Sequence, residues 1–292
     1  MSKVEIKRIL CAVDFSDFSA EACRYAFSLA QHYQAKLFFL HVVEMWKYPS
    51  ASFAGTADLY SQYCHSLTSD ADEQLREFVK AHARGGADIE YAVREGGFAS
   101  DCVYGFAVER AVDVIVMGTH GRHGFDRLML GSVTERVVRQ AHCPVLSVRT
   151  APSRDPGTGA DEGIQLRRIL FSTDFSDYAN QALDYAASLA AKYNSELMLV
   201  HVLEEPDAEA AKRADERLKA FISAETRGNL RVSTSVPSGR AYREIVRLAE
   251  EEKADLIVMA VRGHNALDLA VFGSTAYRVI HLASCPVLAV RA

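Results

Sequence analysis

The stretch KRILCAVDFSD at residues 7–17 returns as RRILFSTDFSD at residues 167–177. Further along, DVIVM at 113–117 returns as DLIVM at 255–259. Repetition at this length indicates that one structural unit occurs twice in the chain. Each stretch contains an apolar run of strand length, and such runs are typical of strands that are covered on both faces.

The two copies divide the chain into domains of ordinary size. We predict a first domain at residues 1–150, a linker at 151–165 and a second domain at 166–292. The linker is rich in Pro, Gly, Ala and acidic residues, a composition typical of flexible connections.

The first copy is longer than the second. The copies lie 160 residues apart at their first matching stretch but 142 apart at the second, so the first copy carries 18 additional residues between 44 and 83. This insertion contains Trp46, the one tryptophan of the chain. It is interpreted as a lid over a ligand, as a partner surface, or as a packed excursion before a helix that begins near Ser69.

Strands and helices are expected to alternate within each copy. Strand-length runs lie at 9–13, 36–42, 88–93, 112–117 and 145–148 of the first copy, and apolar residues recur at helical spacing between them. This order predicts an α/β fold, in each copy a doubly wound, five-stranded parallel sheet with helices on both faces. Ligands of such folds bind beyond the carboxyl ends of the strands.

Composition narrows the range of partners. The net charge is -5, and no Lys/Arg run is long enough to follow a nucleic acid backbone, so no nucleic acid partner is expected. No apolar run approaches a membrane span, and the N-terminus does not resemble a signal peptide, so a cytoplasmic location is expected. The six cysteines lack the spacing of a zinc site, so no metal site is expected.

Polar residues of a ligand site follow the first and fourth expected strands. Asp14 closes the first strand, where it either accepts hydrogen bonds from a ribose or an adenine amine, or holds the turn before the first helix. Gly118 and Gly121 follow the fourth strand, and Gly131 and Ser132 come after nine further residues. Glycines allow close approach of an anion and positive φ, and a helix start favours negative charge, so this segment predicts phosphate binding.

A purely structural interpretation exists for the same helix start. The sequence SVTE at 132–135 matches a capping box, in which Ser132 caps the helix without any ligand. The upstream glycines favour the phosphate interpretation.

These motifs resemble those of the universal stress protein family, whose nucleotide-binding members carry Gly-x2-Gly-x9-Gly-Ser/Thr after the fourth strand. The four motif residues match at Gly118, Gly121, Gly131 and Ser132, and Asp14 matches the aspartate at the end of the first strand. The resemblance covers nearly all of both copies. It implies a tandem protein with two Rossmann-like domains of the adenine nucleotide alpha hydrolase-like type.

The resemblance also implies a nucleotide site in the first copy, with ATP, with or without Mg²⁺, as the ligand. Adenine would lie near the ends of the first two strands, and the ribose and phosphates on the glycine loop and helix start. The residues that this implies are Ala12, Asp14, Val42, Gly118, Gly121, Arg122, Gly131, Ser132, Val133 and Thr134.

The second copy departs from this motif. Ala260 replaces the first glycine, and Tyr277 replaces Glu135 of the capping box. The alanine Cβ is expected to stand where the chain approaches the ribose or phosphates, so weaker or absent binding is predicted. The residues of this weaker second site are Asp174, Val202, Gly263, Gly273 and Ser274.

Three functions stay open on these residues. The first, which the resemblance implies, is a nucleotide-binding stress or regulatory module with at most slow ATP hydrolysis; no Walker A lysine follows a glycine loop. The second is an ATP-hydrolysing or nucleotidyl-transferring enzyme that uses His120 or His123 as its acid-base group. The third is a scaffold that binds another small ligand or a protein.

The last strand of each copy is expected to join the copies. In the family the fifth strands of two domains pair, which predicts pairing of 145–148 with 287–290 within this chain and would cover two open sheet edges. Alternatively, these are core strands only. The resemblance also allows a homodimer.

Overall fold

The computed structural model describes residues 4–47, 57–83, 86–119, 130–149, 164–223, 228–261 and 273–291. The first half contains β1 (Arg8–Ala12), α1 (Asp17–Tyr33), β2 (Lys36–Glu44), the 3-10 turn η1 (Met45–Lys47), α2 (Ala57–His82), β3 (Ile89–Gly96), α3 (Ala99–Glu109), β4 (Val114–Gly118), α4 (Ser132–Gln140) and β5 (Val145–Val148). The second half contains β6 (Arg168–Ser172), α5 (Asp177–Tyr193), β7 (Glu196–Val200), α6 (Ala208–Phe221), β8 (Arg231–Ser235), α8 (Ala241–Glu251), β9 (Leu256–Ala260), α9 (Ser274–Leu282) and β10 (Val287–Val290).

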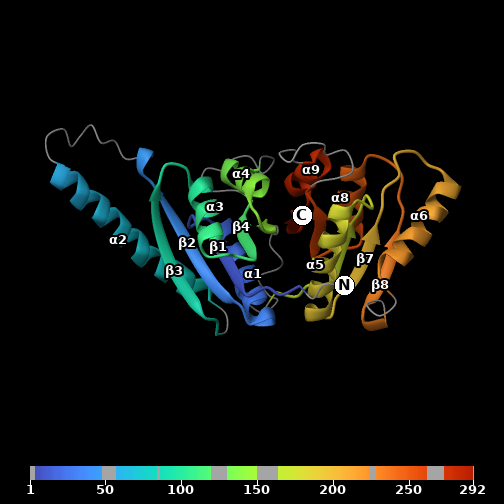
Figure 1. Ribbon diagram of the computed structural model, residues 1–292, viewed down its shortest axis with the longest axis horizontal. Helices are drawn as coiled ribbons and strands as arrows, with labels where there is room; N and C mark the ends of the chain where they lie inside the picture. Colours follow the sequence, from blue (N-terminus) through green and yellow to red (C-terminus); the bar gives the residue numbers. More distant parts are fainter. Residues whose placement is uncertain are drawn as a thin grey trace.

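The strands of both halves form one sheet in the order β3-β2-β1-β4-β5-β10-β9-β6-β7-β8. Within each half all neighbouring strands run parallel, which confirms the predicted α/β fold. The halves meet where β5 and β10 pair antiparallel, with Leu146 opposite Leu288. Each fifth strand thereby covers the edge of the other, and the two halves lie side by side (Figure 1).

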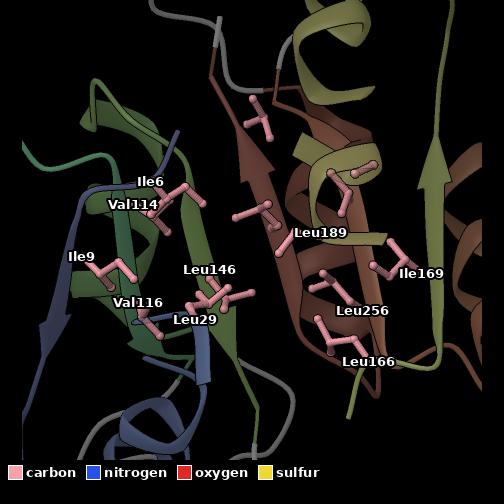
Figure 2. Close-up of a cluster of buried hydrophobic side chains, with 14 of the residues drawn as sticks. Ile6, Ile9, Leu29, Val114, Val116, Leu146, Leu166, Ile169, Leu189 and Leu256 are labelled. Carbon is pink, nitrogen blue, oxygen red and sulfur yellow. The ribbon is translucent and has the colours of Figure 1, made fainter. Parts of the chain in front are cut away.

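Helices cover both faces of the sheet. Because side chains alternate along a strand, Ile9 and Cys11 of β1 contact the layer of α1, α2, α5 and α6, whereas Leu10 contacts the layer of α3, α4, α8 and α9. Each of these two cores runs through both halves. Figure 2 shows part of the first core, in which Leu146 of one half and Leu256 of the other belong to one cluster.

Helices α1 and α5 meet across the junction through reciprocal contacts. The hydroxyls of Ser28 and Tyr193 lie 2.8 Å apart, and those of Tyr33 and Ser188 lie 2.9 Å apart. In the numbering of the repeat Ser28 corresponds to Ser188 and Tyr33 to Tyr193. The contact is therefore self-complementary, as in a two-fold symmetric interface.

The insertion of the first copy lengthens two elements. Helix α2 has 26 residues where α6 has 14, and β2 has 9 residues where β7 has 5. The expected helix start near Ser69 is wrong, because α2 already begins at Ala57. The first part of α2 contains polar residues such as Ser61 and Gln62, so the spacing of apolar residues does not predict a helix there. None of the described helices is long and apolar enough to cross a membrane.

Candidate functional site

A cavity of about 950 Å³ lies in the first half, beyond the carboxyl ends of β1, β2 and β4. Helix α2 lines it from one face of the sheet, and α3 and α4 line it from the other. This is the edge at which ligands of doubly wound folds bind, and the volume is in the range of ligand pockets, about 300–1,000 Å³.

The described residues that were assigned to the first nucleotide site all line this cavity: Ala12, Asp14, Val42, Gly118, Gly131, Ser132, Val133 and Thr134. They come from four elements and two connections, so the fold brings them together from distant parts of the sequence. Gly121, Arg122, His120 and His123 lie outside the described residues.

Asp14 is held in place by the turn that follows β1. Its Oδ1 accepts hydrogen bonds from the Ser16 N–H at 3.1 Å, the Ser16 hydroxyl at 2.6 Å and the Ser19 hydroxyl at 2.5 Å. Ser16 in turn caps α1 by accepting from the Ser19 N–H at 3.2 Å. The turn interpretation is thus confirmed, and the same carboxylate lines the cavity.

Phe15 takes a left-handed conformation in this turn, with φ 64°, which is uncommon for a residue with a large side chain. Its ring packs 4.4 Å from the His41 ring, and His41 Nδ1 donates to the Val13 carbonyl at 2.8 Å. The second half repeats this arrangement with Phe175, φ 60°, and His201. The strained turn is therefore part of the common fold and does not distinguish the halves.

Gly118 ends β4 against α1. A Cβ built on it would lie 2.7 Å from the Phe18 Cβ and 3.0 Å from the Phe18 carbonyl carbon. Its φ is not left-handed. The expectation of a positive φ at Gly118 is therefore wrong, and the packing of α1 against β4 requires the glycine.

Helix α4 begins at the cavity without a side-chain cap. Gly131 is the N-cap residue, with φ -62° and ψ 139°, and no side chain of the described residues caps the helix. The capping box is therefore wrong, because Ser132 stands one position too late and Glu135 instead accepts from Arg139 at 2.9 Å. The first-turn amides of a helix lack partners within the helix and favour an anion.

The start of α4 is tied to the end of β4 from two sides. The Thr134 hydroxyl, which is buried, donates to the Gly118 carbonyl at 2.8 Å. The Gly131 N–H donates to the Thr119 carbonyl, also at 2.8 Å. These bonds fix the amides of the first turn relative to the strand end, so the site is preformed.

The cavity lining also includes Glu44, Lys47, Phe98 and Arg136, which the sequence did not single out, and Trp46 of the insertion that was interpreted as a possible lid. Glu44 accepts from the Ala99 N–H at 3.3 Å and forms an ion pair with Lys47. Burial pushes the pKa of Glu44 upward, but hydrogen bonds from Lys47, Ala99 N–H and Trp46 outweigh it and leave the pKa lowered. Arg136 lies four residues after Ser132, so the helical spacing could have placed it on the same face.

The matching turn of the second half is built differently. Ala179 stands where Ser19 stands in the first half, and Asp174 Oδ1 accepts from the Ser176 N–H at 3.0 Å. Ser176 Oγ is buried and has no hydrogen-bond partner among the described residues, and Asp174 is exposed.

The start of α9 repeats that of α4. Gly273 is the N-cap residue, its N–H donates to the Val261 carbonyl at 2.8 Å, and Ser274 begins the helix. Val202 lies just beyond the end of β7 and is half-buried, and Gly263 lies outside the described residues. The second half thus keeps the helix start but lacks the serine that fixes the aspartate.

The sheet order, the helices on both faces and the cavity at the strand ends define a tandem α/β protein of the Rossmann-like class. Within this class, the model of the universal stress protein family matches residues 5–149 and again residues 165–291. The chain belongs to the universal stress protein family.

Individual relatives agree with this assignment. A universal stress protein of Methanocaldococcus jannaschii is 36% identical over 143 residues, which cover 49% of this chain and 82% of that protein. Universal stress protein YxiE of Bacillus subtilis is 31% identical over 146 residues, covering 49% of this chain and 98% of that protein. The crystal structure of a universal stress protein from Archaeoglobus fulgidus matches 98% of this chain and 97% of its own, with TM-score 0.69 and 22% identity, a likeness of fold.

Proposed function

We propose that the chain is an ATP-binding stress-response or regulatory module, that its first half holds the nucleotide, and that it hydrolyses ATP slowly at most. One observation carries the proposal. The described residues that the glycine motif and the strand ends single out in the sequence all line one cavity of about 950 Å³.

The strand ends suit the nucleoside. Ala12 closes β1 and Val42 lies near the end of β2, so both offer apolar contact to a planar base. Asp14, oriented by Ser16 and Ser19, is an acceptor for ribose hydroxyls or for the adenine amine.

The start of α4 suits the phosphates. The amides of Ser132 and Val133 belong to a first turn that no described side chain caps, and the helix dipole adds partial positive charge there. Arg136, on the cavity wall, supplies a full positive charge, whereas the charge of Lys47 is paired with Glu44. Magnesium, when present, would arrive with the triphosphate.

The second half is proposed to bind nucleotide more weakly or not at all. It lacks a counterpart of Ser19, the serine whose hydroxyl donates to Asp14 in the first half. We also propose that residues 1–150 and 166–292 act as two domains, joined within one cytoplasmic chain through β5 and β10. The antiparallel register of these strands supports this pairing.

The test is to denature freshly purified protein and to identify released nucleotide by chromatography, followed by thermal melting with added ATP. A ligand selective for the folded state at 100 times its Kd raises stability by about 2.7 kcal/mol. Ser132→Asp places a carboxylate at the proposed phosphate position, where it stabilises the helix start but repels phosphate. Ser274→Asp makes the same change in the second half and serves as the matched control.

We expect about one adenine nucleotide per chain, or a rise in melting temperature with ATP, that Ser132→Asp abolishes and Ser274→Asp retains. If no nucleotide is released and ATP leaves the melting temperature unchanged, the scaffold interpretation replaces this proposal. If Ser274→Asp loses the ATP-induced rise in melting temperature and Ser132→Asp keeps it, the nucleotide site lies in the second half.

A further inference from the structure

Two large aromatic side chains stand at the cavity of the first half in contact with solvent. The side chains of Trp46 and Phe98 are 64% and 54% exposed, and both line the cavity. Trp46 lies in η1 and Phe98 directly before α3. Exposed aromatics that gather in a cavity indicate a stacking surface for a ligand, because packing does not account for them. We name Trp46 and Phe98 the aromatic rim.

Each ring of the aromatic rim carries a cation beside it. Lys47 Nζ lies 5.4 Å from the Trp46 ring centroid, and the Arg136 guanidinium carbon lies 5.1 Å from the Phe98 ring centroid. An aromatic ring can stack on a planar base, and a cation beside that ring can bind an anion that is joined to the base.

Glu44 holds the two sides of the aromatic rim together. One of its oxygens accepts from the N–H of Ala99, the neighbour of Phe98, and the other pairs with Lys47, the neighbour of Trp46. The rim is therefore organised by the protein itself.

The aromatic rim lies in the same cavity as the proposed phosphate position. Arg136 is one helical turn beyond Ser132 on α4 and rests on Phe98, so the helix that begins at the proposed phosphate position also contacts the rim. The second half has Arg240 in the place of Phe98 and no tryptophan, so the rim belongs to the first half alone.

We propose that the aromatic rim is a subsite for a second base, and that the preferred ligands are dinucleotides in which two nucleosides are joined through several phosphates. This proposal rests on the proposed function, since the first base and the phosphates occupy the nucleotide site. The cavity volume of about 950 Å³ lies near the upper end of the range for ligand pockets, which leaves room for a ligand larger than ATP.

Trp46 allows a direct test because it is the one tryptophan of the chain. Its fluorescence is followed while the full-length protein is titrated with ATP and, separately, with diadenosine tetraphosphate, and calorimetry gives both Kd values. We expect the dinucleotide to quench Trp46 and to bind roughly tenfold more tightly than ATP, as one further stacked base provides. ATP is expected to bind with little quenching.

Variants separate stacking from general effects. Phe98→Ala should remove most of the advantage of the dinucleotide and should weaken ATP binding much less, because ATP loses only the support that Phe98 gives to Arg136. Trp46→Ala, measured by calorimetry, should do the same. Tyr104→Ala removes another exposed aromatic of α3, one that does not line the cavity, and should change neither Kd.

The outcomes distinguish this proposal from the proposed function. If ATP binds but the dinucleotide binds no more tightly, or if Phe98→Ala and Trp46→Ala weaken both ligands equally, the second-base subsite is overturned and ATP binding stands. If neither ligand binds, both proposals are overturned. Tighter dinucleotide binding that the rim variants abolish supports the subsite.

Discussion

The imidazole of His281, in the second half, accepts a hydrogen bond from the backbone N–H of Leu130, in the first half, with an Nδ1 to N distance of 3.0 Å. Leu130 directly precedes Gly131, the N-cap residue of α4. Because β5 and β10 run antiparallel, the last turn of α9 reaches the sheet edge at which α4 begins. The second copy thus supports the ligand site of the first.

This hydrogen bond predicts a pH-dependent stability. The groups around His281 are Arg149, Glu135, Arg139 and Tyr277. Burial, and then the charge of Arg149, lower the pKa of His281 below its usual 6.5, against a smaller opposing effect of Glu135. A histidine with a lowered pKa stabilises the fold fully above the pKa of the unfolded chain, and this stability is lost as pH falls through 6.5 toward the lower folded value.

Thermal melts between pH 8 and pH 5 check this prediction. His281→Asn keeps an acceptor that does not titrate, so its melting temperature should fall less steeply with pH than that of the wild type. His142→Gln, at an exposed histidine of the first half, is the control and should follow the wild type. Equal slopes for wild type and His281→Asn would contradict the assignment.

Gly118→Ala should lower the free energy of unfolding by about 1–3 kcal/mol, because the new Cβ would meet Phe18 at 2.7 Å and α1 would have to shift. Urea unfolding measures the change. Gly105→Ala is the control, since no atom lies within 4 Å of a Cβ there and alanine favours a helix by about 1 kcal/mol. If the Gly118→Ala protein is as stable as the wild type, α1 can shift away from the new Cβ without a cost in stability, which would contradict this prediction.

Ser19→Ala should weaken the turn that orients Asp14. The Ser19 hydroxyl is buried, donates to Asp14 Oδ1 and accepts from the Asp14 N–H at 3.0 Å, so its loss should cost about 1–3 kcal/mol. We also expect a higher Kd for ATP. Ala179→Ser introduces the hydroxyl at the matching position of the second half. It should leave binding by the first half unchanged, and an equal loss in both variants would argue against a local effect.

Ser147→Ala should raise the free energy of unfolding by about 1 kcal/mol. Ser147 Oγ is buried in β5 and has no hydrogen-bond partner among the described residues, and the second copy has Ala289 at the matching position. Ser28→Ala provides the contrast: Ser28 is also buried but is bonded to Tyr193, so this change should destabilise by about 1 kcal/mol. The denaturant midpoints of both variants are measured. Changes of the same sign in Ser147→Ala and Ser28→Ala would contradict the prediction that a buried serine hydroxyl stabilises the fold only when it is hydrogen-bonded.

Much of this architecture could be predicted because the repeat marks it twice. The apolar strands recur in both copies, as does the Gly-Ser pair at 131–132 and 273–274, and together they place Asp14 and Ser132 at one sheet edge. The packing that requires a glycine at position 118 could not be predicted. Phe18 lies 100 residues earlier, and only the packing of α1 against β4 brings the two residues together.

Other parts of the site depend on contacts between distant elements. Trp46 and Phe98 approach the same cavity because β2 extends to Glu44 and pairs with the end of β3, a length that apolar periodicity does not reveal. His281 reaches Leu130 only through the antiparallel junction of the copies. Neither contact leaves a local pattern in the sequence.

The junction of β5 and β10 has one further consequence. Edge strands on separate molecules find each other at a rate and extent set by their concentration, so dilution separates them. Here both strands belong to one molecule, and their encounter is unimolecular. The ten-stranded sheet, and with it the bond from His281 to Leu130, therefore persists at protein concentrations where a pair of single-copy chains would fall apart.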